Sequence, residues 1–335
     1  MSGKKERILS ERQLIAEIAA QQKGSEPENL IQGIGDDCAV QRISEGRVSL
    51  LTTDTLVEGV HFDPGWHPQY QLGRKSVSVN VSDIAAMGGH PQFALLSLGI
   101  PKSCDQLWLD DFLAGFTSAL KDYHLCLIGG DTVHSGERFM VSVTVIGEMA
   151  EESVCYRSGA QSGDLVWVSG FLGDAAAGLE LCRRGMTDKG KVQTLVNAHL
   201  DPEPRVALGE ELARSGLVHA MMDVSDGLAT DLAHICTASG VGAEIDALSV
   251  PLSDALQEAA ACLQIPVLDL ALQGGEDYQL VFTTSSDSRE KILSLVSDLG
   301  QHVSCVGRII EGSGVILCQG DERMDISYRG YEHIF

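Results

Sequence analysis

The sequence predicts an α/β (α+β) protein with two domains. Its 335 residues exceed the typical size of one domain, and the usual relation between length and domain number gives about two. Both halves of the chain alternate apolar runs typical of strands with stretches of helical periodicity. Between them lies a polar segment rich in small residues, EESVCYRSGAQSGD. We therefore expect domains at residues 1–150 and 151–335.

The first half should open with a helix and then alternate strands and helices. Ser10 and Gln13 form a capping-box pattern, and apolar residues follow at helical spacing from Leu14 to Ala19. Asp83 falls inside a later helical stretch that ends at Gly88. The elements expected next are a strand at 48–53, a helix at 69–87, a strand at 93–100, a helix at 105–122, a strand at 125–132 that breaks at its two glycines, and a strand at 139–149.

The second half repeats this alternation. We expect a strand at 164–170, a helix that begins in GDAAAGLELCRR, a strand, turn and helix within 217–240, and a turn and strand at 273–284. No low-complexity segment or short repeat interrupts the pattern. Strands and helices of moderate length in both halves are typical of two α/β or α+β domains.

Composition limits the partners of this chain. It has 24 Lys and Arg against 47 Asp and Glu, a net charge of −23. A surface this acidic repels nucleic-acid phosphates and anionic membranes, so we expect neither as a partner. A polyanionic substrate would need metal ions to enter.

Cysteine usage and the N-terminus favour a cytoplasmic location. The nine cysteines are scattered, odd in number and without a CxxC pair, which is typical of buried thiols in a reducing compartment. The segment MSGKKERILSERQLIAEIAA lacks the apolar core of a signal peptide. No apolar run approaches the roughly 18 residues of a membrane span.

Five short segments place a carboxylate at a strand end or tight turn, beside glycine or hydroxyl residues. They are GIGDD (Asp36, Asp37), TTDT (Asp54), NVSD (Asp83), GGDT (Asp131) and DVSDGL (Asp223, Asp226). Several aspartates that converge at strand ends make an oxygen-ligand site for a hard cation such as Mg²⁺ bridged to phosphates. Thr52 and Thr53 offer further hydroxyl or carbonyl oxygens.

Each of these residues also has a simpler interpretation. Asp226 suits a helix cap, and Asp36 and Asp37 suit a turn beside a glycine. Asp83 is harder to explain in this way, because a carboxylate inside an apolar helix is costly without a partner. His61 is either a ligand contact or structural, and Arg157 reaches either a phosphate or a surface acid.

No Walker A sequence and no GxSxG elbow occurs, so ATP binding through a P-loop is excluded.

Taken in order, the motifs resemble a known family. GIGDD, TTDTLVEGVHF, KSVSVNVSDIAAMGG, LIGGDT, DVSDGL and GGEDYQL look like those of bacterial thiamine-monophosphate kinase, within the aminoimidazole ribonucleotide synthetase-like superfamily. The likeness spans Gly33 to Tyr331. It implies an N-terminal domain that contributes to a dimeric β-barrel, hence a homodimer, and a C-terminal α/β domain.

The resemblance also implies an activity: ATP- and Mg²⁺-dependent phosphorylation of thiamine monophosphate to thiamine diphosphate, the last step of its biosynthesis. The implied ligands of several Mg²⁺ ions are Asp37, Thr52, Thr53, Asp54, Asp83, Asp131, Asp223 and Asp226. The implied ATP contacts are Gly130, Asp131, Arg157 and Ser225. The implied thiamine-phosphate contacts are His61, Glu276 and Tyr328, where the family often has Trp at the last position.

This chemistry is consistent with the absence of an obvious catalytic base. The acceptor is a phosphate, whose oxygen is already a nucleophile, so positioning and charge neutralisation should suffice. Arg157 would clamp ATP phosphates, Glu276 would offer negative charge or an acceptor to the thiamine rings, and Tyr328 would face the cationic thiazolium.

Two alternatives stay open at this point. One is a sibling ATP-dependent synthetase, against which TTDT and GGEDYQL speak. The other is a non-enzymatic protein that binds metal or nucleotide through the same acids.

Overall fold

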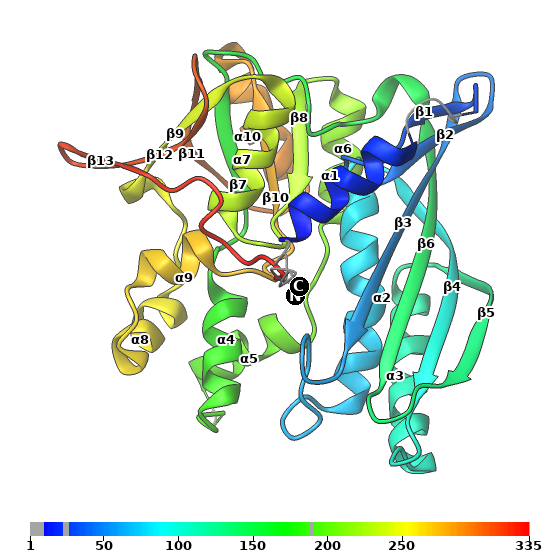
Figure 1. The fold of residues 1–335 in the computed structure, drawn as a ribbon. Helices are drawn as coiled ribbons and strands as arrows, with labels where there is room; N and C mark the ends of the chain where they lie inside the picture. The colour runs from blue at the N-terminus through cyan, green and yellow to red at the C-terminus, as the bar shows by residue number, and fades with distance from the viewer. Residues whose placement is uncertain (1–9, 23–26, 188–189, 335) are drawn as a thin grey trace, which may run out of the picture.

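The computed structural model describes residues 10–22, 27–187 and 190–334, and builds each half of the chain on its own sheet (Figure 1). Residues 1–9 of the N-terminal segment, which bear on the expected absence of a signal peptide, lie outside the described residues. The first half contains α1 (Glu11–Gln22), β1 (Leu30–Gln32), β2 (Ala39–Ser44), β3 (Arg47–Val57), α2 (Gln69–Ala86), β4 (His90–Ile100), α3 (Gln106–Asp122), β5 (Cys126–His134), β6 (Met140–Ala150) and the 3-10 turn η1 (Glu151–Ser153).

The first sheet has six strands in the order β1-β2-β3-β6-β4-β5; α2 packs on it and α3 packs on α2. Glycine allows these two helices to approach closely: a Cβ on Gly115 would lie 1.8 Å from the carbonyl oxygen of Tyr70, and one on Gly73 would lie 2.1 Å from that of Phe112. This close packing holds α2 and α3 together, and α2 in turn contacts β3, β4 and β6 of the sheet.

The second half forms a seven-stranded sheet in the order β13-β12-β9-β11-β7-β10-β8. Its elements are β7 (Leu165–Ser169), α4 (Asp174–Arg183), α5 (Lys191–Leu200), α6 (Val206–Ser215), β8 (Val218–Asp223), α7 (Leu228–Ser239), β9 (Gly242–Asp246), η2 (Ala247–Ser249), α8 (Asp254–Leu263), α9 (Val267–Gln273), β10 (Leu280–Thr284), η3 (Ser286–Ser288), α10 (Arg289–Asp298), β11 (Val303–Ile310), β12 (Gly314–Gln319) and β13 (Glu322–Asp325).

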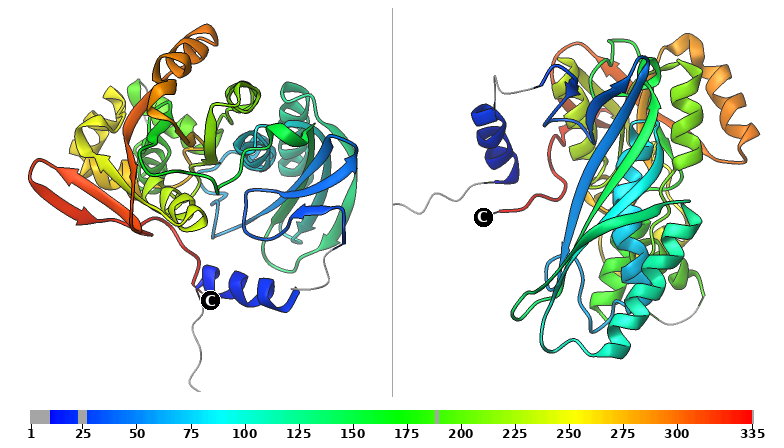
Figure 2. Two further views of the ribbon diagram at one scale, coloured as in Figure 1. Left: turned by 90° about the horizontal axis from the view of Figure 1, so that it is seen from above. Right: turned by 90° about the vertical axis from the view of Figure 1, so that its right-hand side faces the viewer.

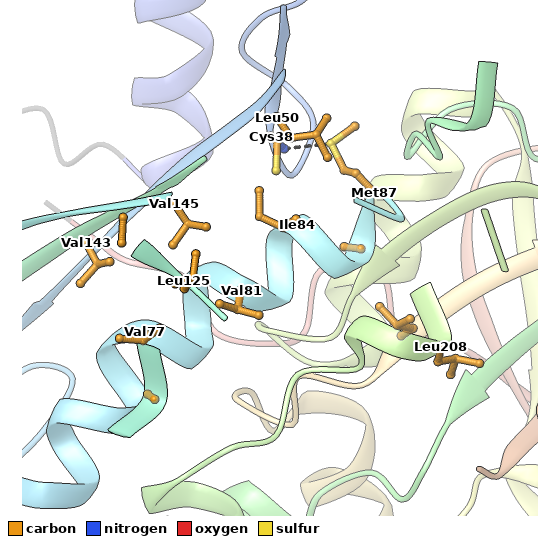
Figure 3. Close-up of a cluster of buried hydrophobic side chains, with 14 of the residues drawn as sticks. Cys38, Leu50, Val77, Val81, Ile84, Met87, Leu125, Val143, Val145 and Leu208 are labelled. Carbon is orange, nitrogen blue, oxygen red and sulfur yellow. Dashed lines mark hydrogen bonds between the residues drawn. The ribbon is translucent and has the colours of Figure 1, made fainter. Parts of the chain in front are cut away.

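A single hydrophobic cluster joins the two halves along α2 (Figure 3). Val81 and Ile84 of α2 and Val143 and Val145 of β6 belong to this cluster, and Leu208 of α6 joins it from the second half. The cluster surrounds a helix that also carries buried polar side chains. Helix α2 is therefore the element through which both halves position the residues between them.

The N-terminal helix α1 lies apart from both sheets, next to the end of the chain (Figures 1 and 2). The backbone N–H of Glu11 donates to the carbonyl of His333 at 3.0 Å, and Arg12 makes a bidentate ion pair with Glu332. The two ends of the described chain are thus tied together.

Most of the expected elements are confirmed, with one difference that matters for the site. The prediction that the strand at 125–132 breaks at its glycines is wrong: β5 continues through Gly129 and Gly130 to His134. Its parallel pairing with β4 is maintained across a single register shift, so the glycines sit inside the strand.

The structure also bears on the expectations about cysteines and membrane-spanning segments. All nine cysteines are free thiols. Among the described residues no single helix is long and apolar enough to cross a membrane; α8 and α9 reach that length and apolarity only when joined across a 113° bend.

Candidate active site

Three carboxylates from separate parts of the chain meet where the two halves join. Asp37 precedes β2, Asp83 lies on α2 and Asp223 ends β8, and each offers an oxygen within 4.8 Å of the other two. Oδ2 of Asp37 is buried with no hydrogen-bond partner among the described residues. An all-oxygen donor set with an unpartnered buried oxygen fits a hard divalent cation.

The charges in this cluster repel one another. Burial, followed by the charge of Asp37, raises the pKa of Asp223 to about 8. Burial, followed by the charges of Asp54 and Asp223, raises the pKa of Asp83 well above its usual range. A bound divalent cation would offset the same repulsion and favour the ionised carboxylates.

Strand alternation brings Thr52 and Asp54 to this cluster but turns Thr53 away. Thr52 Oγ1 donates to Oδ2 of Asp83, and the N–H of Asp54 donates to the side-chain oxygen of Asn80, also on α2, at 2.9 Å. Burial raises the pKa of Asp54 to about 6. Thr53 Oγ1 instead accepts from Thr144 on the other face, so its hydroxyl does not join the cluster. Only the carbonyl of Thr53 stays a predicted ligand.

Asp131 does not join the cluster within one chain. Cross-strand neighbours share a face, and the pairs Asp131–Ser97, Ser97–Ser142 and Ser142–Thr55 place Asp131 on the face of Thr53 and Thr55. It also lies on β5, three strands from β3, and is exposed. Within one chain Asp131 therefore lies apart from the other aspartates, and its role as a metal ligand stays a prediction.

Gly130 has a packing reason to be glycine. Its φ is 152°, and a Cβ there would lie 1.8 Å from the carbonyl oxygen of Leu96 on β4. The GGD sequence thus meets a steric requirement of the β4–β5 pair, whether or not a nucleotide lies nearby.

Arg157 lies in the segment between the two sheets and pairs with the acids of GIGDD. Its Nη2 lies 2.6 Å from Oδ1 of Asp37, and its backbone N–H donates to Asp36. Burial, with the charge of Asp37 second, raises the pKa of Asp36 to about 7. The sequence left two possible partners for Arg157, a phosphate or a surface acid. In the structure its partner is an acid, Asp37, which is buried and not on the surface.

Two loops, 223–227 and 274–279, lie side by side, and the first begins at Asp223 of the cluster. The N–H of Glu276 donates to the carbonyl of Ser225 at 2.7 Å, and that of Tyr278 donates to the carbonyl of Val224 at 2.9 Å. The N–H of Tyr331 donates to the carbonyl of Asp226 at 3.0 Å, which adds the C-terminal segment to the group. Burial raises the pKa of Asp226 to about 6, with the charge of Glu11 second.

Glu276 already has two partners. Lys75 Nζ lies 2.8 Å from its Oε1, and His199 Nδ1 lies 2.8 Å from its Oε2. Its negative charge is thus balanced by a lysine that is completely buried. This pairing was not expected from the sequence.

The face of Tyr328 is occupied by a cation from the other end of the chain. The guanidinium carbon of Arg12 lies 4.1 Å from the centre of the Tyr328 ring, and Tyr328 Oη lies 2.6 Å from Oγ1 of Thr237. His61 accepts from the N–H of Val57 through Nδ1 and contacts the ring of His333 at 5.2 Å between ring centres.

Comparison with known proteins decides the family. Residues 35–149 match AIR synthase related protein, N-terminal domain, and residues 161–318 match AIR synthase related protein, C-terminal domain. The thiamine-monophosphate kinase of Escherichia coli (strain K12) is 37% identical over 304 residues, 90% of this chain and 91% of that protein. That of Bacillus subtilis (strain 168) is 37% identical over 306 residues, 90% and 93% of the two chains.

The chain belongs to the thiamine-monophosphate kinase family.

Solved structures of thiamine-monophosphate kinases share its two-domain fold. "AaThiL complexed with AMPPCP and TMP" is 33% identical, covers 99% of both chains and superposes with a TM-score of 0.83. The crystal structure of the kinase from Stenotrophomonas maltophilia K279a is 36% identical, covers 93% of this chain and 98% of that one, and gives a TM-score of 0.75. A HypE complex with ATP, 18% identical with a TM-score of 0.68, shares the fold alone.

Several residues around the thiamine-monophosphate kinase motifs were not singled out from the sequence. Lys75 lies in KSVSVNVSD, where a charge inside an apolar helix was the signal already used for Asp83. Ser82 of the same motif donates to Asp223 at 2.6 Å. Asp277 accepts from the N–H groups of Gly173 and Ala175 at the start of α4, which explains the acid after Glu276 in GGEDYQ.

Proposed function

We propose that this chain transfers the terminal phosphoryl group of ATP to the phosphate of thiamine monophosphate, giving ADP and thiamine diphosphate. The observation that carries the proposal is the meeting of Asp37, Asp83 and Asp223 beside Arg157, between the two halves. Full-length similarity to kinases of this name, and to a structure that contains AMPPCP and TMP, supports it.

The metal would be Mg²⁺, held as several ions by the aspartate groups. Asp37, Asp83 and Asp223 form the central set, Thr52 and Asp54 extend it along β3, and Asp226 extends it along the following loop. When bound, Mg²⁺ neutralises phosphate charge and aligns the two phosphates for in-line transfer. The carbonyl of Thr53 and the carboxylate of Asp131 complete the proposed ligands.

The residues of this chain would bind and orient both phosphates rather than move a proton. The acceptor phosphate is ionised near neutral pH, so no general base is assigned. Arg157 would contact ATP phosphates from its place beside Asp37, and Ser225 would contact ATP from the loop after β8. Gly130 and Asp131 are the remaining proposed ATP contacts.

The thiamine end would lie near Glu276, His61 and Tyr328. The carboxylate of Glu276 keeps acceptor capacity beyond its two partners, because each oxygen has a further lone pair. The Tyr328 ring offers an aromatic face that already attracts one cation, Arg12.

A homodimer is the proposed assembly. The sheet face that carries Asp131 also exposes Phe93 by 40% and Val133 by 54%, and every residue of β5 is exposed. A long apolar edge strand left open to water is a template for pairing with another chain. A second copy that covers this face would form the β-barrel that the family resemblance implies.

The remaining proposals concern domains and location. We propose a domain boundary near residue 150, at the end of β6, with the N-terminal unit at 1–150 and the C-terminal unit at 151–335. We propose a cytoplasmic location, in keeping with nine free thiols.

A product assay tests the activity. The protein is incubated with ATP, Mg²⁺ and thiamine monophosphate, and the products are identified by chromatography and mass. Free thiamine replaces the monophosphate as a control. Formation of thiamine diphosphate supports the proposal; binding of metal and ATP by calorimetry without any thiamine diphosphate would contradict it and favour a non-enzymatic binding protein.

A further inference from the structure

The carboxylate of Glu276 is held from two directions by two buried residues. Lys75 of α2 binds Oε1 and His199 of α5 binds Oε2, each at 2.8 Å. Lys75 is 0% exposed and His199 is 1% exposed, whereas the Glu276 side chain is 26% exposed. Its partners are therefore buried, while part of the Glu276 side chain stays accessible.

The two partners are also fixed relative to each other. Lys75 Nζ donates to the backbone carbonyl of His199 at 3.0 Å. The ring of His199 contacts Trp66 at 5.6 Å and His67 at 6.0 Å between ring centres. The pair thus forms a rigid base under Glu276, made of one residue from each half of the chain.

The backbone at Glu276 is held in an uncommon conformation. Its φ is 67°, in the left-handed region that side chains other than glycine rarely adopt, and Tyr278 follows at 48°. The intervening Asp277 anchors the loop on Gly173 and Ala175. Such a conformation persists only where the surroundings enforce it, and it is typical of functional sites.

The charges show which partner determines the ionisation. Burial raises the pKa of Glu276, but the charge of Lys75 and the hydrogen bond from His199 outweigh burial and hold that pKa below its usual range. Burial, followed by the charge of Lys75, lowers the pKa of His199. Lys75, which is completely buried 2.8 Å from Oε1, therefore supplies the positive charge beside Glu276.

We propose that Lys75 and His199 are positioning residues for thiamine monophosphate, which act by holding the carboxylate of Glu276 in place beside the thiamine rings. The inference rests on the proposed function of the site, and it adds residues of α2 and α5 to the determinants of substrate specificity. A purely structural role for the pair would predict lost stability without a selective change in substrate binding.

The first experiment compares Lys75→Met with Lys75→Arg. For Lys75→Met we expect the KM for thiamine monophosphate to rise by about tenfold or more, a cost typical of breaking a buried charge pair, while the KM for ATP stays within about twofold. Lys75→Arg, which keeps the charge, should recover part of the loss. Equal effects on both KM values would overturn the proposal.

A second pair of variants keeps the test valid if Lys75→Met does not fold. His199→Asn retains a donor near the position of Nδ1, and His199→Phe removes it. We expect the KM for thiamine monophosphate to rise in the phenylalanine variant and to change much less in the asparagine variant. Equal KM values in the two variants would contradict the assignment.

Arg74→Met is the matched control. Arg74 precedes Lys75 on α2 and pairs with Asp201 at 2.7 Å, directly after α5, so it links the same two elements without touching Glu276. We expect this variant to lower the melting temperature and leave the KM for thiamine monophosphate unchanged. A rise in that KM equal to that of Lys75→Met would show that any contact between α2 and α5 matters, and would overturn the proposal.

A double-mutant cycle separates this inference from the function itself. If Lys75 acts through Glu276, Lys75→Met should add little to the loss of kcat/KM in Glu276→Gln. Multiplicative losses would overturn the inference. A wild-type protein that makes no thiamine diphosphate would refute the proposed function, whereas an active one with an unaffected Glu276→Gln variant would refute only the positioning role.

Discussion

Arg157 Nη2 lies 2.6 Å from Oδ1 of Asp37, while Oδ2 of the same carboxylate is buried without a hydrogen-bond partner in the described parts of the chain. One oxygen is thus neutralised within the protein and the other is left for a cation. This division lets a single aspartate connect the arginine proposed for ATP phosphates with the acids proposed for Mg²⁺.

Asp37→Asn should therefore lower kcat by roughly 100-fold or more, because the metal loses a charged ligand. Activity is measured against Mg²⁺ concentration, with the melting temperature as a check of folding. Asp111→Asn, on the exposed surface of α3, serves as the control and should behave as wild type. A folded Asp37→Asn protein with wild-type turnover at saturating Mg²⁺ would contradict the metal assignment.

Asp131 allows a test of the proposed homodimer. If Asp131 serves the site of the partner, then Asp37→Asn and Asp131→Asn chains should each be inactive as homodimers but form one intact site when paired. Co-expression with two different tags and tandem purification yields the mixed dimer. We expect about half of the wild-type kcat per dimer, since a twofold assembly has two equivalent sites. A mixed dimer as inactive as its parents would place Asp131 in the site of its own chain, or outside any site.

The guanidinium of Arg12 lies over the face of the Tyr328 ring, where the cationic thiazolium is expected to bind. Two cations cannot share one ring face, so the substrate must displace the guanidinium. Arg12→Gln should then lower the KM for thiamine monophosphate by about two- to fivefold, in line with a cation–π contact of about 0.5–1 kcal/mol. Steady-state kinetics with thiamine monophosphate as the varied substrate test this. An increase in KM would mean that Arg12 helps to hold the substrate instead.

His67 should make stability depend on pH. It is 1% exposed, and burial, followed by the charge of Lys75, lowers its pKa to about 2. Below pH 6.5 the unfolded chain gains a proton on this residue that the folded chain does not bind. Stability from His67 is therefore fully present above pH 6.5 and is lost as the pH falls, by about 1.4 kcal/mol per pH unit for one proton.

Urea denaturation of wild type and His67→Phe between pH 8 and 5 measures this term. The difference in the free energy of unfolding between the two proteins should stay constant above pH 7. Below pH 6.5 the free energy of unfolding of the wild type should fall relative to that of His67→Phe, by about 1.4 kcal/mol per pH unit. A difference that is constant over the whole range would show that His67 binds a proton in the folded state.

Sequence patterns were sufficient to predict local structure and the residue types of the site. An apolar run at 48–53 predicted part of β3, and a carboxylate in an apolar helix correctly marked Asp83 as unusual. These are properties of neighbouring residues. They depend on period and propensity, which the sequence carries directly.

Long-range pairing could not be read in the same way. The contacts of Glu276 with Lys75 and His199 join residues separated by 201 and 77 positions in the chain, and no local pattern records them. The face of Asp131 depends on the register of four strands, and the apparent break at Gly129 and Gly130 is a close approach to β4. Such features follow from packing between elements.

The central claim is that the terminal phosphoryl group of ATP moves intact to thiamine monophosphate. The most direct measurement uses ATP labelled in its γ-phosphate, with Mg²⁺ and thiamine monophosphate, and follows the label by chromatography. We predict labelled thiamine diphosphate and unlabelled ADP in equal amounts, and no product when Mg²⁺ is chelated. Label found only in inorganic phosphate, with no thiamine diphosphate formed, would contradict the account.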